Sequence, residues 1–135
     1  MRQFIAHISL LIPDYDEAIA YFTQVLDFDL IEDKSMGDDK RWVLVRPKGD
    51  EKGCNLLLAK ASKESQILAI GNQTGGRVFL FLHTDDIERD YKAYTEKGVQ
   101  FINPPNVQPH GKVAIFKDKY GNLWDLIEAK SKSEN

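Results

Sequence analysis

Four side chains have the chemistry of a functional site: three histidines and one aspartate set in apolar sequence. The chain of 135 residues contains His7, His83 and His110. An imidazole titrates near neutral pH and is a common metal ligand. Asp125 lies in the apolar run LWDLIE, and burying a carboxylate costs free energy unless it is paired or bound to a metal. Asp125 is therefore a stronger candidate for a functional group than His7; the alternative is that it faces a buried cation or amide.

Each histidine also has an ordinary structural interpretation. A lone histidine in a strand is more often a satisfied structural residue than a ligand. Strand alternation puts His83 on the same face as Phe79; the alternative is that His83 caps the turn at Asp85. His110 stands next to Gly111 at the start of a predicted strand, where it either borders a ligand site or is an exposed loop residue. Both pairs of alternatives stay open.

An internal repeat indicates which elements hold these residues. Residues 8–31, ISLLIPDYDEAIAYFTQVLDFDLI, align without a gap with residues 79–102, FLFLHTDDIERDYKAYTEKGVQFI. Each copy begins with a strand-like apolar run and reaches an aspartate, Asp14 or Asp85, with a glutamate three residues later. Each then continues at helical period and ends in a second apolar run. The repeat predicts strand, helix, strand in each half.

The remaining pattern completes an α+β fold of two tandem βαβββ modules. Helices are predicted at 14–26 and 86–97, the second ending at Gly98. A polar segment between the modules, with a short helix at 64–70, is interpreted as a linker rather than a phosphate loop, because no helix follows its glycines. Further strands are predicted from β-branched and aliphatic runs at 41–45, 54–59, 112–116 and 122–128. We expect one domain over 1–135, with module one at 3–61, linker 62–76 and module two at 77–130.

Composition excludes several classes of partner. The net charge is −3 and the pI about 5.6, so there is no positive field to attract nucleic acid or an anionic membrane. No apolar stretch approaches the roughly 20 residues of a membrane span. The apolar run near the amino terminus is too short for a signal sequence. We therefore expect a cytoplasmic protein.

Motifs at both ends of the chain resemble the vicinal oxygen chelate superfamily of glyoxalases, extradiol dioxygenases and bleomycin resistance proteins. They are HISLLIPDYDEAIAYF at the front and DKYGNLWDLIE at the back, of which D-x-x-G-N-x-W-D-L is the more specific. The resemblance implies that each module curls into a half-barrel and that a cleft between them holds a divalent metal.

The resemblance implies four metal ligands, one from the first and one from the fourth strand of each module. His7 matches the first of these positions and Asp125 the last. The fourth strand of module one offers only the leucines of residues 56–58, and the first strand of module two offers Val78 or Phe79. Leucine, valine and phenylalanine cannot bind a metal, so the site falls short of the 2-His-1-carboxylate set of non-haem iron.

The resemblance also implies an apolar, aromatic cleft suited to a small hydrophobic or aromatic molecule. Trp42 is either a core residue or a stacking platform, whereas Trp124 is predicted to lie in the core. The positions expected to face a ligand are Ser9, Trp42, Phe79, Phe81 and His110, together with Leu11, Leu44 and Val113.

Two functions follow as hypotheses. The first is a lyase, isomerase or oxygenase in which His7 and Asp125 act with or without a metal and Asp125 or His83 transfers protons. The alternative is a metal-free protein that sequesters a small molecule, as bleomycin resistance proteins do. A homodimer is expected in either case, because the sheet edge that a half-barrel leaves is commonly covered by a partner.

Overall fold

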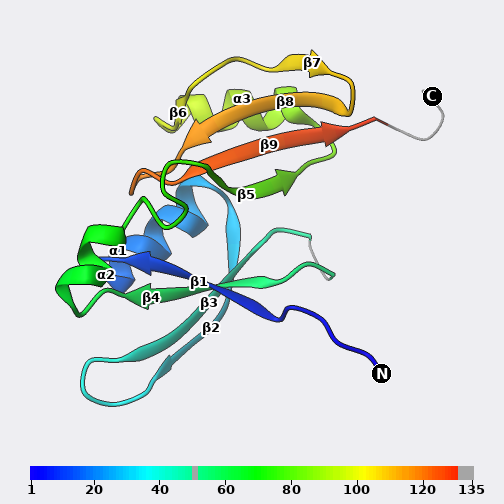
Figure 1. Cartoon of the computed structure of the whole chain (residues 1–135). Coiled ribbons are helices and arrows are strands. Elements are labelled where there is room, and N and C mark those ends of the chain that lie inside the picture. Colours follow the sequence, from blue (N-terminus) through cyan, green and yellow to red (C-terminus); the bar gives the residue numbers. More distant parts are fainter. Residues whose placement is uncertain (50–51, 131–135) are drawn as a thin grey trace. The chain divides into compact units, whose positions relative to one another are not determined.

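The computed structural model describes residues 1–49 and 52–130, and the chain divides into two compact units, Met1–Ile70 and Gly71–Asn135 (Figure 1). Each unit holds one mixed sheet and its own helices. The α+β class and the repeated βαβββ order are confirmed.

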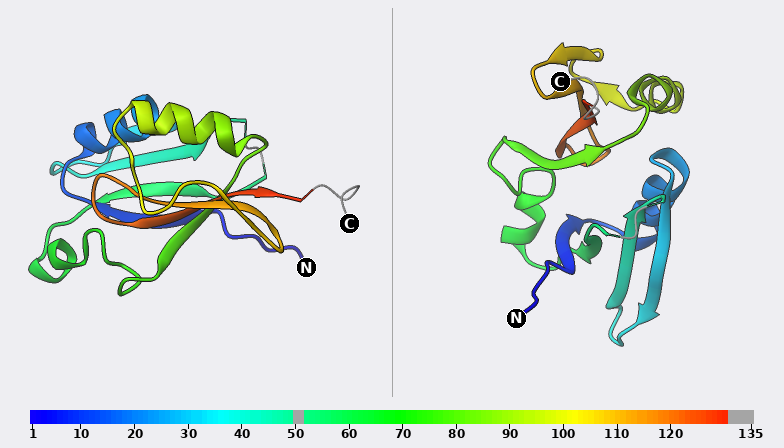
Figure 2. Two further views of the ribbon diagram at one scale, coloured as in Figure 1. Left: turned by 90° about the horizontal axis from the view of Figure 1, so that it is seen from above. Right: turned by 90° about the vertical axis from the view of Figure 1, so that its right-hand side faces the viewer.

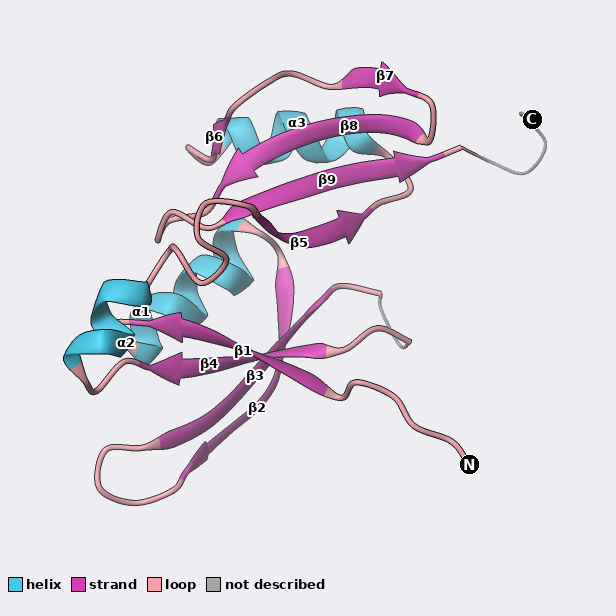
Figure 3. Cartoon of the chain, in the orientation of Figure 1, coloured by secondary structure: helices cyan, strands magenta, loops and turns pink. Residues whose placement is uncertain are grey.

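The first unit carries a sheet in the order β1-β4-β3-β2. Strand β1 runs parallel to β4, and the other two pairings are antiparallel (Figure 3). Helix α1 packs against β3 and β4. The elements are β1 (His7–Ile12), α1 (Tyr15–Ala20), the π-helix η1 (Tyr21–Val25), β2 (Phe28–Ser35), β3 (Arg41–Pro47), β4 (Asn55–Lys60) and α2 (Glu64–Ala69).

The first predicted helix is present as α1 followed directly by η1. Its start is set by Asp14, whose Oδ2 accepts a hydrogen bond of 2.8 Å from the backbone N–H of Glu17, as an N-cap should. Ala18, Phe22 and Leu26, four residues apart, are all buried. This spacing puts them on one helical face, and that face forms part of the core of the first unit.

The second unit carries a sheet in the order β5-β9-β8-β6, with β5 parallel to β9. Helix α3 lies across one face of this sheet (Figure 2) and contacts β8 and β9. Two short strands, β6 and β7, both pair with β8, and the prolines between them have no N–H to donate to a continuous ladder. The elements are β5 (Val78–His83), α3 (Ile87–Glu96), β6 (Gln100–Phe101), β7 (Asn106–Gln108), β8 (Gly111–Lys117) and β9 (Leu123–Ala129).

The gapless alignment of the two halves is wrong by one residue at the second helix. The N-cap of α3 is Asp86, whose Oδ1 accepts from the N–H of Arg89 at 3.0 Å. Asp85 instead forms an ion pair of 2.8 Å with the Arg89 guanidinium. An irregularity in β5 between Val78 and Leu80 accommodates the additional residue, as a β-bulge does.

The irregularity in β5 leaves two candidates for the equivalent of His7. Phe79 precedes the cap Asp86 by the same number of residues as His7 precedes the cap Asp14. By register the equivalent is Val78, which pairs with Leu123 of β9 as His7 pairs with Asn55 of β4. The position of His7 therefore corresponds to Val78 or Phe79.

Candidate functional site on the open faces of the two sheets

Strand alternation divides the first sheet into a covered face and an open face. On β1, Leu10 and Ile12 are fully buried, whereas His7 and Ser9 are exposed. Leu57 of β4 is the register partner of both Ser9 and Leu44. Leu57 therefore lies at the centre of the open face.

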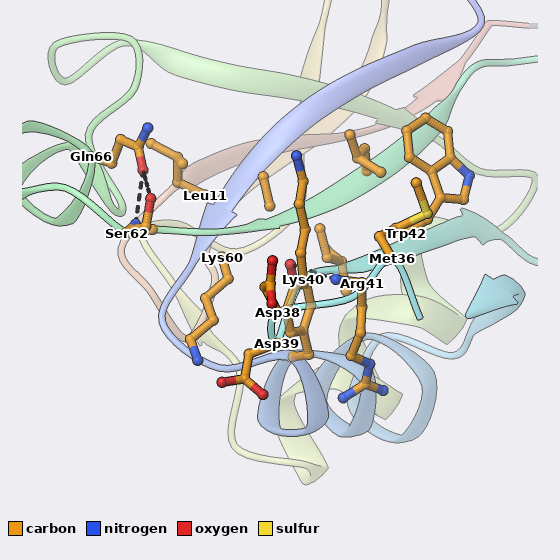
Figure 4. Close-up of a pocket in the computed structure, with 15 residues that line it drawn as sticks. Leu11, Met36, Asp38, Asp39, Lys40, Arg41, Trp42, Lys60, Ser62 and Gln66 are labelled. Carbon is orange, nitrogen blue, oxygen red and sulfur yellow. Dashed lines mark hydrogen bonds between the residues drawn. The ribbon is translucent and has the colours of Figure 1, made fainter. Parts of the chain in front are cut away.

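A pocket of about 670 Å³ occupies part of this open face (Figure 4). Its apolar lining includes Leu11, Trp42 and Leu57. Its polar lining includes Asp39 and Lys60, both labelled in Figure 4. The combination of an apolar wall with a few polar groups is typical of small-molecule sites.

The two tryptophans have different environments. Trp42 is half-buried, lines the pocket and contacts His7 edge to face, with ring centroids 5.7 Å apart. Trp124 is 2% exposed, stacks on Phe116 and donates from Nε1 to Asp118 Oδ2 at 2.9 Å. The prediction that Trp124 is a core residue is confirmed, whereas Trp42 is half-buried at the pocket.

The arginine at the start of β3 is fully engaged within the protein. Arg41 donates to both carboxylate oxygens of Asp33, at 3.1 and 2.7 Å, and to Asp16 at 3.0 Å. Its guanidinium also lies over the ring of Tyr15. The hydrogen bonds that Arg41 donates to Asp33 and Asp16 raise the pKa of Arg41, and the same bond to Asp33 lowers the pKa of Asp33. Arg41 thus stabilises the hairpin beside the pocket.

The second sheet presents a titratable group on its open face. Asp125 of β9 is the register partner of Phe81 and Ile115, while its neighbours Trp124 and Leu126 are buried on the covered face. Asp125 Oδ1 is buried and has no hydrogen-bond partner in the described part of the chain. Burial raises the pKa of Asp125.

Two of the predicted histidines lie within electrostatic reach of Asp125. The charges of His110 and His83 both lower the pKa of Asp125 and so oppose the effect of burial. Both histidines are exposed. In the turn before α3, the hydroxyl of Thr84 accepts a hydrogen bond of 3.2 Å from the backbone N–H of Asp86. Asp125, His83 and His110 all belong to the second unit, and His83 lies on β5 two residues from Phe81, the register partner of Asp125.

The other predicted site residues are divided between the units. His7, Ser9 and Trp42 belong to the first, and Ser9 is exposed on its open face. In the second, Phe79 is half-buried and Phe81 is 63% exposed. The roles assigned to all of these residues stay predictions.

The residues at the four expected ligand positions do not fit a metal centre. Leu57 occupies in β4 the place that Asp125 occupies in β9, because their partners Ser9 and Phe81 precede the two helix caps by the same number of residues. The four positions therefore hold His7, Leu57, either Val78 or Phe79, and Asp125. Two of these are hydrocarbon side chains without a donor atom. Across residues 1–49 and 52–130, no three His, Cys, Asp or Glu side chains are grouped to hold an ion.

The D-x-x-G-N-x-W motif has a structural role. Asp118, 4% exposed, accepts hydrogen bonds from Tyr120 N, Asn122 N, Asn122 Nδ2 and Trp124 Nε1, all at 2.9 or 3.0 Å. These bonds fix the turn before β9 and with it the position of Asp125. Sequence reasoning missed this role of Asp118. The signal in the sequence was the spacing D-x-x-G-N-x-W, in which an aspartate precedes a glycine turn and a tryptophan. Aspartate in such a position commonly bonds the backbone of the turn.

Sequence reasoning also missed the polar residues of the pocket. Asp39 and Lys40 come from the hairpin between β2 and β3, and Lys60 ends β4. They lie in polar sequence without periodicity, so no local pattern separates them from ordinary surface residues.

The chain belongs to the glyoxalase/bleomycin resistance protein/dioxygenase superfamily, whose sequence model matches residues 4–126. An uncharacterized protein of Shewanella frigidimarina is 54% identical over 133 residues, covering 98% of each chain. Among solved structures, UcmS2 is 28% identical with a TM-score of 0.81, covering 96% of this chain and 100% of that one. TnmS3, an antibiotic binding protein from Streptomyces sp. CB03234, is 27% identical with a TM-score of 0.76, covering 96% and 98%.

None of the helices in the described residues is both long and apolar enough to cross a membrane.

Proposed function

We propose that this protein binds a small, planar aromatic molecule reversibly on the open face of its first sheet. The observation that carries the proposal is the pocket of about 670 Å³ that contains Trp42 and Leu57. Leu57 places hydrocarbon where the family pattern calls for a metal ligand. A ligand is therefore held by packing against carbon rather than by coordination.

The physical basis of binding is the burial of apolar area. Each Å² of apolar surface removed from water contributes about 25 cal/mol, and stacking on an indole adds to this. The similarity to TnmS3, which is described as an antibiotic binding protein, supports binding without conversion. A homodimer, a cytoplasmic location and a single domain over 1–135 stay predictions that accompany this proposal.

The two tryptophans make a direct test possible. The chain has only two, so a ¹⁵N-labelled sample gives two indole N–H resonances, assigned with the variant Trp42→Phe. On titration with 2-methylnaphthalene, the Trp42 resonance shifts saturably. The Trp124 resonance stays in place, because that indole is buried and bonded to Asp118. A Trp42 resonance that never moves would contradict the proposal.

A second function, proton transfer by Asp125, is favoured by one specific observation. Burial raises the pKa of Asp125, and its Oδ1 has no partner among the described residues. A carboxylate with a raised pKa is a stronger base, as an isomerase or lyase requires. Deuterium incorporation into phenylacetone in D₂O measures this activity. The expected result is incorporation by the native protein that is lost in Asp125→Asn; no incorporation by the native protein removes this candidate.

A further inference from the structure

A second pocket, of about 400 Å³, lies at one end of the open face of the second sheet. Its lining includes two half-buried apolar residues, Ile115 of β8 and Leu123 of β9. Their neighbours Phe116 and Trp124 are buried on the covered face, so alternation puts Ile115 and Leu123 on the open one. Ligand pockets measure about 300–1,000 Å³, and this pocket is therefore large enough for a small molecule.

The glycine-rich loop before β5 forms one wall of this pocket. Gly71 and Gly76 both line it. Gly71 packs directly on the turn before β9, because a Cβ at this position would overlap the backbone oxygen of Tyr120. Within the loop, Thr74 Oγ1 donates to the carbonyl oxygen of Arg77 at 2.6 Å. The glycine-rich end of the predicted linker is thus packed against the second unit, where it shapes the pocket.

Two basic side chains line the pocket, and no acidic residue is among the described residues that line it. Arg77 directly precedes β5, and Lys117 ends β8. Val78 and Lys117 are both register partners of Leu123, so the two basic residues flank the start of β9, with β5 and β8 about 10 Å apart. Neither basic residue forms an ion pair with another described residue.

We infer that this pocket binds a small carboxylate that carries a short apolar tail. The inference goes beyond the proposed function and does not depend on it, because the two pockets share no residue. The carboxylate accepts hydrogen bonds from the Arg77 guanidinium, whose planar fork matches two carboxylate oxygens, and it pairs with the flexible Lys117 ammonium. The tail packs on Ile115 and Leu123, where the burial of each carbon adds to the affinity.

Both halves of this ligand follow from the lining. The chain has a net charge of −3, so a pocket with two basic and no acidic lining residues differs from the rest of the protein. A neutral ligand leaves the two cations without a counter-charge. An inorganic anion leaves the apolar residues Ile115 and Leu123 in contact with water. A carboxylate with an apolar tail satisfies both.

Four compounds test the site: 4-methylpentanoate, 4-methyl-1-pentanol, acetate and inorganic phosphate. The reporter is the δ1-methyl resonance of Ile115 in protein labelled with ¹³C at its isoleucine methyl groups, assigned with the variant Ile115→Val. The resonance of Ile87, which is fully buried, is the internal control and stays in place. We expect 4-methylpentanoate to bind at least tenfold more tightly than each of the other three, because it alone engages both the cations and the apolar lining.

Substitution of the basic residues identifies the charged partners. Arg77→Gln should weaken the binding of 4-methylpentanoate by about tenfold and Lys117→Gln by about threefold, while the affinity for 4-methyl-1-pentanol stays the same. Both residues are exposed, so neither substitution should lower the Tm. Lys92→Gln removes the same charge from an exposed residue of α3, on the covered side of the sheet, and is the matched control that keeps the native affinity.

Three results would overturn the inference. Acetate or phosphate binding as tightly as 4-methylpentanoate would show that the pocket responds to charge alone, and equal binding of the alcohol would show that charge plays no part. An Ile115 resonance that stays in place with all four compounds would show that the pocket takes none of them. Equal weakening by Lys92→Gln and Arg77→Gln would show that overall charge, and not this pocket, governs binding.

Discussion

The fourth strands of the two modules hold the same place in their sheets but carry opposite chemistry. In the first unit Leu57 is the register partner of Ser9, so the apolar residue lies on β4 and the polar one on β1. In the second unit Asp125 is the register partner of Phe81, and the arrangement is reversed. The repeat therefore has an apolar residue at the centre of the open face in one unit and a titratable residue there in the other.

The covered faces of the same strands did not diverge. Leu10 pairs with Leu58 in the first sheet and Leu82 with Leu126 in the second, and Leu10, Leu58 and Leu126 are fully buried. Side chains packed under a helix must fill a fixed volume, whereas side chains on an open face are free of that constraint. The open faces are therefore where function was able to change.

The largest effect is expected at the turn that supports the second open face. Asp118→Ala leaves four hydrogen-bond donors without their acceptor and should destabilise the protein by about 3–4 kcal/mol. Urea unfolding measures the loss. The Trp124 indole resonance should broaden or move further than that of Trp42, because only Trp124 is bonded to Asp118.

The exposed Asp16 provides a matched control for this substitution. Asp16→Ala removes a carboxylate whose side chain is 82% exposed and should cost less than about 1 kcal/mol. A loss this small in Asp118→Ala would mean that the turn does not depend on Asp118.

The next largest effect is expected on ligand affinity when the side chains at positions 57 and 125 are exchanged. Leu57→Asp places a carboxylate in the apolar wall of the pocket and should weaken the binding of 2-methylnaphthalene by about tenfold, measured from the Trp42 resonance. The reciprocal variant Asp125→Leu should leave this affinity unchanged. Equal weakening by both variants would show that the ligand is not confined to the open face of the first sheet. It would contradict the division between an apolar face in one unit and a titratable face in the other.

The smallest effect is a dependence of stability on pH at Asp125. Burial raises the folded-state pKa of this residue, so the folded protein favours the protonated form, and ionisation at higher pH opposes folding. Asp125→Asn should therefore raise the Tm near pH 7 by about 2 °C, a small value because the side chain is partly solvated.

The pH at which this gain disappears checks its cause. Below about pH 4, the pKa of an unfolded aspartate, both variants are neutral at this position and their Tm values should coincide. A gain that persists at pH 3 would show that charge is not responsible.

The sequence by itself determined the order of elements and the faces of the strands. Alternation and helical spacing are local, so they predicted the helices that start at Asp14 and near Asp86, the burial of Trp124, and Asp125 as a carboxylate in a buried strand. The end motifs likewise indicated the family, which the comparisons confirm. These properties depend on residues close together in the chain.

Only the tertiary structure decided which polar atoms have partners. Arg41 and Arg46 stand five positions apart on one strand, yet Arg41 bonds to Asp16, 25 residues away, and Arg46 Nε has no hydrogen-bond partner among the described residues. The amide of Asn55 meets His7 across 48 residues of sequence. Such pairs form only when strands that are far apart in the sequence align in register. The physical reason is that hydrogen bonding requires contact in space, whereas the sequence patterns report only which face a residue occupies.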